Sequence, residues 1–81
     1  MTDDDARRAI LASIGAVAPD AEIGQLADDD DLLDTLDLDS MDVLNIVTDL
    51  HRRTGVDIPE RDYGKLDTLG TFIAHVVSLA P

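Results

Sequence analysis

A serine set among aspartates is the residue of this chain best placed to do chemistry. Ser40 lies between Asp39 and Met41, with Asp37 and Asp42 also within three residues of it. An apolar-periodic stretch follows directly, so Ser40 is predicted to be the N-cap of a helix, where a side-chain oxygen accepts a hydrogen bond from a free amide. An enzyme that acts on this hydroxyl must bring positive charge to the aspartates around it. The pattern favours a point of covalent attachment over a catalytic serine.

A catalytic or metal-binding role finds no support elsewhere in the chain. His51 lies three helical turns beyond Ser40, too far to deprotonate it, and His75 is predicted to lie at the edge of an apolar stripe with one side in water. The acidic run from Asp28 to Asp31 lacks the glycine and terminal glutamate of a calcium loop and is predicted to be a solvated surface. No catalytic residue and no metal site are expected.

Composition limits the classes of partner and the size of the core. With 81 residues, the chain is expected to form one domain over 1–81 and to be a monomer. Its 18 acidic and 6 basic residues give a net charge of −12, which disfavours nucleic acid and anionic lipid and favours proteins with basic faces. There is no cysteine, and the chain shows neither a signal peptide nor a membrane-spanning run, so no membrane insertion and a cytoplasmic location are expected.

Helical periodicity recurs in three stretches that would position the serine. The first is predicted to begin after Thr2 and to stop near Ala18, before Pro19, with Asp3–Arg7 and Asp4–Arg8 as ion pairs. The second follows Ser40, ends near Arg53 and is closed by Gly55. The third is capped by Thr68 and ends at Pro81. Their apolar stripes are Ile10, Ile14 and Val17; Val43, Ile46, Val47 and Leu50; and Leu69, Phe72, Ile73, Val76, Val77 and Ala80.

The remaining segments are predicted to connect these helices. Residues 19–39 show no sustained periodicity and are expected to form a long but ordered loop. Residues 56–59 are expected to be extended, and Pro59 to open a short helix over 60–63 that Gly64 ends. The predicted fold is therefore all-α, a small bundle of three main helices plus one short helix, with a long loop between the first two.

The order and spacing of several motifs resemble those of the acyl carrier protein family. The likeness comprises Asp39–Asp42 with the helix that follows, Val56–Pro59, Lys65-Leu66 and Thr68-Leu69, and so covers most of the chain. It implies the same bundle fold, and a 4'-phosphopantetheine group bound covalently to Ser40 with Asp39 beside it. The implied partners are a phosphopantetheinyl transferase that uses coenzyme A and Mg²⁺, an acyl- or aminoacyl-activating ligase, and a downstream synthase or transferase.

The resemblance also implies a docking surface, and it leaves the cargo open. The implied recognition residues are Asp39, Met41, Asp42, Leu44, Asn45 and Thr48, with a pocket for an acyl chain between helix 41–53 and residues 58–69. Many fatty-acid carriers have glycine at the position of Asp37 and glutamate at those of Asn45, His51, Arg52 and Arg53. These departures favour a specialised carrier in fatty-acid, lipid or specialised-metabolite synthesis. An aminoacyl, D-alanyl or peptidyl carrier, and an unmodified acidic adaptor, remain alternatives.

Overall fold

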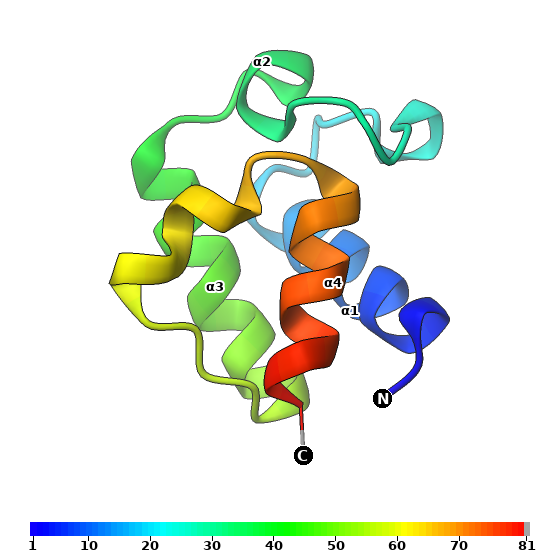
Figure 1. Cartoon of the computed structure of the whole chain (residues 1–81). Coiled ribbons are helices and arrows are strands. Elements are labelled where there is room, and N and C mark those ends of the chain that lie inside the picture. Colours follow the sequence, from blue (N-terminus) through cyan, green and yellow to red (C-terminus); the bar gives the residue numbers. More distant parts are fainter. Residues whose placement is uncertain (81) are drawn as a thin grey trace.

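Three long helices make up most of the fold. The computed structural model describes residues 1–80, and its main elements are α1 (Asp3–Val17), α3 (Ser40–Thr54) and α4 (Leu69–Leu79) (Figure 1). The predicted all-α bundle is confirmed. The expectation that Pro81 ends the last helix lies outside the described residues. None of the helices over residues 1–80 combines the length and apolar character needed to cross a bilayer.

Local signals in the sequence set most of the helix ends. Thr2 caps α1, where its Oγ1 accepts from the Asp5 amide at 3.1 Å, and Thr68 caps α4 by accepting from the Thr71 amide at 3.1 Å. At the end of α3, Gly55 has a left-handed backbone with φ of 75°, a conformation that glycine adopts without the steric cost of a Cβ. These three predicted boundaries are confirmed.

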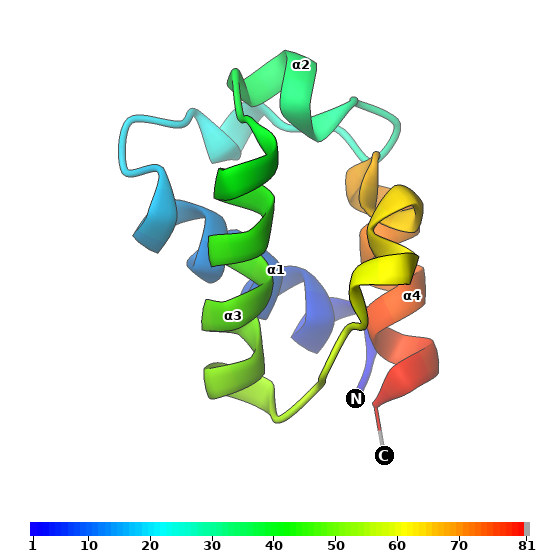
Figure 2. The ribbon, with the colours of Figure 1, turned by 90° about the vertical axis from the view of Figure 1, so that its left-hand side faces the viewer.

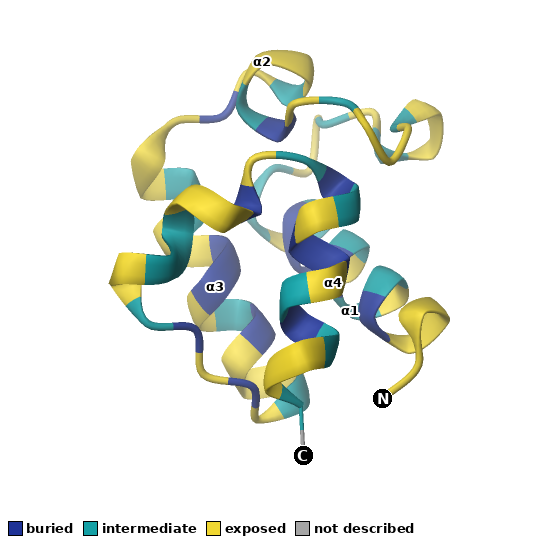
Figure 3. Ribbon diagram, in the orientation of Figure 1, coloured by how far each residue is buried: buried dark blue, intermediate teal, exposed yellow. Residues whose placement is uncertain are grey.

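The apolar stripes of the helices meet in one core. Helix α1 packs against both α3 and α4, so it holds together two elements that have no comparably extensive contact with each other in the described chain (Figure 2). Buried residues line the facing sides of the helices, and exposed ones the outside (Figure 3). The core consists of Ala6, Ile10, Ile14, Leu32, Leu38, Ile46, Val47, Leu50, Val56, Ile58, Leu66, Leu69, Phe72, Ile73 and Val76.

The long first connection contains two short elements that were not predicted. These are the 3₁₀ helix η1 (Ile23–Gln25) and the helix α2 (Leu32–Leu36). Asp31 caps α2 by accepting from the Asp34 amide at 3.0 Å, and the Leu32 amide donates to the Asp67 carbonyl at 2.8 Å. A five-residue helix is too short to show a hydrophobic period, so contacts with distant residues, which periodicity does not reveal, contribute to its stability.

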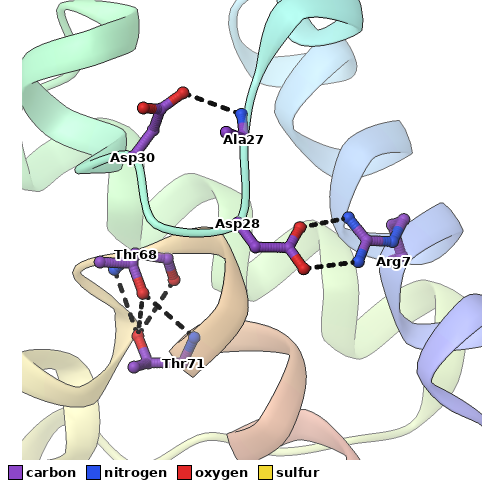
Figure 4. A network of polar contacts seen from close by, with 6 residues as sticks. All are labelled: Arg7, Ala27, Asp28, Asp30, Thr68 and Thr71. Atoms are coloured by element: carbon purple, nitrogen blue, oxygen red, sulfur yellow. Dashed lines mark hydrogen bonds and ion pairs between the residues drawn. The ribbon is translucent and has the colours of Figure 1, made fainter.

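The acidic run in this connection is largely solvent-exposed, as predicted, but its side chains also make contacts within the fold. The two terminal guanidinium nitrogens of Arg7, Nη1 and Nη2, donate to the Asp28 carboxylate at 2.6 and 2.9 Å. Asp30 accepts from the Ala27 amide at 2.8 Å (Figure 4). The predicted ion pairs of Arg7 and Arg8 with aspartates four residues earlier are absent from the described chain. Asp28 binds both terminal nitrogens of Arg7, and such a bidentate pair is stronger than a single exposed contact between neighbours on one helix.

The segment after α3 is extended and then helical, as predicted, but the helix is longer than predicted. Val56 and Ile58 are buried, and the 3₁₀ helix η2 runs over Glu60–Leu66 and packs on α4. The prediction that Gly64 ends this helix was wrong. Leu66 is buried, and its anchorage in the core outweighs the weak local preference of glycine against helix.

Candidate functional site

The start of α3 differs by one residue from the prediction, and the difference concerns Ser40. Asp39 is the N-cap: its Oδ1 accepts from the Asp42 amide at 2.9 Å, and Asp42 Oδ2 accepts from the Asp39 amide at 3.2 Å. The two carboxylates thus form a reciprocal capping box. The prediction that Ser40 is the N-cap was therefore wrong, and Ser40 is the first residue within the helix.

The hydroxyl of Ser40 is left exposed and uncommitted. No hydrogen bond from this side chain to another residue is found over residues 1–80, and the residue is solvent-exposed. The chain has two other serines. Ser13 is fully buried, and Ser78 is exposed but donates its hydroxyl to the His75 carbonyl at 2.7 Å. Of the three, Ser40 combines access with a free hydroxyl.

The loop before Ser40 is held by a buried leucine and a left-handed aspartate. Leu38 is 8% exposed and its amide donates to the Leu33 carbonyl at 2.9 Å, which fixes the loop to the end of α2. Asp37 has φ of 55°, a conformation that is costly for most residues and free for glycine. The sequence analysis noted Asp37 as a departure from the resemblance, and glycine would adopt this backbone without that cost.

The residues predicted for partner recognition form an exposed strip on α3. Met41 is 60% exposed and Leu44 41%, unusually high values for large apolar side chains, and Asn45 and Thr48 are exposed as well. Asp39 is exposed and Asp42 half-buried. The structure therefore places all six beside Ser40 or along the outer face of the helix it begins. Apolar groups within an acidic setting suit a protein interface.

A largely apolar pocket of about 350 Å³ opens beside Ser40. It lies between α3 and η2, in the region where the sequence analysis placed a possible acyl pocket. Its lining consists of Asp31, Leu33, Ser40, Val43, Tyr63, Gly64, Leu66 and Asp67. The part contributed by Asp31 and by Leu33 of α2 was not foreseen, whereas Asp67 lies within the predicted segment 58–69. The carbonyl of Asp67 binds the α2 amide, a contact between residues 35 positions apart that no local pattern indicates.

The two histidines lie away from Ser40 and pair with acids. His75 Nε2 is 3.0 Å from Asp62 Oδ2 with both side chains mostly buried, so this histidine links α4 to η2. His51 Nδ1 is 3.5 Å from Asp57 Oδ1 at the exposed end of α3. The boundary position predicted for His75 is confirmed. Both histidines have structural partners in the described chain, and neither is placed as a base for Ser40.

Two comparisons with known proteins each match most of the chain. A family model described as the phosphopantetheine attachment site matches residues 8–76, most of the chain. An acyl carrier protein of Rhodococcus erythropolis is 27% identical over 73 residues, which cover 86% of this chain and 80% of that protein. The match includes the whole of α3 and the pocket beside it.

Proposed function

Since the chain belongs to the acyl carrier protein family, whose members bear a covalent 4'-phosphopantetheine group, we propose that Ser40 is its attachment residue. The exposed and uncommitted hydroxyl of Ser40 at the start of α3 is the observation that carries this proposal. When bound, the group supplies a thiol on a flexible arm, which holds cargo as a thioester. The chain itself has no cysteine, so that sulfur must come with the cofactor.

The residues around Ser40 fit such a group. The hydroxyl faces solvent, where a modifying enzyme can reach it, and the amides at the start of α3 favour a phosphodiester. The capping box of Asp39 and Asp42 fixes the helix start without using the hydroxyl. The pocket beside Ser40 gives cargo a place to be shielded from water.

The modification is a phosphoryl transfer in which Ser40 is the nucleophile. Ser40 Oγ forms a bond to the pantetheine-side phosphorus of coenzyme A, and the phosphoanhydride bond breaks. Adenosine 3',5'-bisphosphate leaves with the bonding electrons, and the hydroxyl proton passes to a base of the separate transferase. Both histidines of the described chain pair with acids away from Ser40, and we assign the role of base to the transferase.

An acyl group is the cargo that the pocket favours. Leu33, Val43 and Leu66 give its walls an aliphatic character, and each methylene buried against such walls is worth roughly 0.8 kcal/mol. An aminoacyl group would bring an ammonium against these walls at a desolvation cost, and Asp31 and Asp67 are the carboxylates of the lining that could pair with it. Loading assays with an acyl-adenylate ligase and with amino-acid-adenylating enzymes distinguish the two, and we expect transfer from the former.

The strip of α3 is the proposed docking surface for the transferase, the ligase and the downstream synthase. Asp39 and Asp42 would attract basic partner faces, and Met41 and Leu44 would supply the apolar contact. The helix is acidic at its start and basic at its end, where Arg52 is exposed. This polarity favours a partner set specific to one pathway of fatty-acid, lipid or specialised-metabolite synthesis.

Incubation with a phosphopantetheinyl transferase, Mg²⁺ and coenzyme A, followed by intact mass, tests the proposal. We expect the chain to gain the mass of one phosphopantetheinyl group, Ser40→Ala to gain none, and Ser78→Ala to gain it as the native chain does. If the native chain gains nothing while a known carrier is converted, the alternative of an unmodified acidic adaptor is correct.

A further inference from the structure

A second pocket lies along α3 beyond the one at Ser40. Its volume is about 270 Å³, and it is bounded by Val47, Thr48 and His51 of α3 and by Asp57 and Ile58 of the extended segment. The α3 residues of the first pocket are Ser40 and Val43, and those of the second are Val47, Thr48, His51 and Arg52. Steps of three and four place Ser40, Val43, Val47 and His51 on one stripe of the helix, so the two pockets are successive parts of one groove.

Tyr63 is the residue that the two pockets share. It lines both pockets, and no other residue is common to the two linings. It is half-buried, and burial raises the pKa of its hydroxyl, with Glu60 and Asp57 adding to the effect. The ring therefore stands between an apolar pocket and one whose rim carries His51, Arg52 and Asp57.

The backbone that carries Tyr63 is fixed from the side opposite α3. The amide of Asp62 donates to the Pro59 carbonyl at 2.9 Å, and its carboxylate pairs with His75 of α4 at 3.0 Å. Helix η2 packs on α4 and has no comparably extensive contact with α3 in the described chain. Tyr63 therefore lines both pockets from a helix whose backbone is tied to α4.

We infer that Tyr63 limits the length of the acyl chain that the protein can shield, by closing the first pocket against the second. The inference rests on the proposed function, because the chain must enter from Ser40. Acyl groups that fit between Ser40 and the ring are held within the first pocket. Longer ones leave their ends in water, because passage beyond the ring is blocked.

A graded series of cargo tests this partition. The native chain and Tyr63→Ala are loaded by a transferase with acyl-coenzyme A thioesters from butanoyl to hexadecanoyl, and hydrolysis of each thioester is followed. In the native chain, each added methylene should slow hydrolysis by up to about fourfold until the pocket is filled, after which the rate stays level. In Tyr63→Ala the hydrolysis rate should become level only at a longer acyl group.

Matched variants separate the partition from general effects. Tyr63→Phe keeps the ring and Arg61→Ala changes an exposed residue of η2 that lines neither pocket, so both should keep the native cut-off. If circular dichroism shows that Tyr63→Ala does not fold, Tyr63→Leu, which shortens the side chain, takes its place. In Tyr63→Leu the acyl length at which hydrolysis levels off should still exceed that of the native chain, by a smaller margin than removal of the whole side chain would give. Equal cut-offs in the native chain and the folded variant overturn the inference but not the carrier function. Failure of the native chain to accept any acyl-pantetheine overturns both.

Discussion

At the scale of single residues, the division of work between Asp39 and Ser40 explains how a modified serine can begin a helix. Asp39 caps α3, so Ser40 can take the first helical position with its hydroxyl free. The sequence analysis identified the serine but assigned it the cap. Serine and aspartate have nearly equal capping preferences, and helix ends are uncertain by a residue or two. The spacing of Asp39 and Asp42, three residues apart, is the signal that indicates the correct cap.

This division predicts unequal stability effects at neighbouring residues. Asp39→Ala should lower the free energy of unfolding by about 1 kcal/mol, because the capping box is lost. Ser40→Ala should change it by less than about 0.5 kcal/mol, because the hydroxyl has no partner to lose. Urea unfolding of the unmodified proteins measures both, with Asp39→Asn as the variant that keeps a capping oxygen. A larger loss in Ser40→Ala than in Asp39→Ala contradicts the assignment.

At the scale of elements, the first connection is hydrogen-bonded to both α1 and α4. Asp28 binds Arg7 of α1 through its side chain, and its carbonyl accepts from the Gly70 amide of α4 at 2.8 Å. A Cβ at Gly70 would lie 3.1 Å from that carbonyl, so the close approach depends on glycine. These contacts join residues distant in sequence. Local patterns therefore predicted the three helices and the caps at Thr2, Gly55 and Thr68, but not the order within 19–39.

The ion pair of Asp28 predicts a particular loss of stability in acid. The hydrogen bond from Arg7 holds the pKa of Asp28 below its usual value of 3.8, so the folded state binds this proton less readily than the unfolded state. The stabilisation is therefore complete above about pH 4 and is lost as the pH falls through the lowered pKa. The stability difference between the native chain and Asp28→Asn should be constant at higher pH and shrink below it.

Unfolding by urea at a series of pH values checks this expectation. Asp29→Asn is a suitable control, since it removes the same charge from an exposed neighbouring residue. Its difference from the native chain should lack the acid-dependent decrease. An Asp28→Asn difference that stays constant down to the lowest pH contradicts the role assigned to the pair with Arg7.

At the scale of the whole molecule, the bundle is small and strongly acidic. Its Cα radius of gyration is 11.1 Å, so the charges that sum to −12 lie within a few Debye lengths of one another. This charge steers basic partners toward the molecule and also destabilises the compact state through self-repulsion. The amphipathic stripes made the bundle predictable from the sequence. The pocket beside Ser40 was predicted only in outline, because Asp31 and Leu33 reach it through a contact of the α2 segment with the distant Asp67.

The charge predicts that salt stabilises the protein. The midpoint temperature of unfolding at pH 7 should rise as sodium chloride increases from low to physiological concentration, because screening weakens the repulsion. The rise in midpoint temperature that salt produces should be smaller near the isoelectric point of about 4.1, where the net charge vanishes. Calorimetry at low and at physiological sodium chloride, at each of the two pH values, measures the midpoint temperature. A midpoint that is insensitive to salt at pH 7 contradicts a destabilising role for the net charge.

The central claim concerns which atom of the chain bears the cofactor, and fragment mass spectrometry of the protein co-produced with a transferase tests it most directly. The account predicts a single phosphopantetheinyl group, located on the peptide that contains Ser40. The same group found on Ser78 or on any threonine, with Ser40 unmodified, would contradict it.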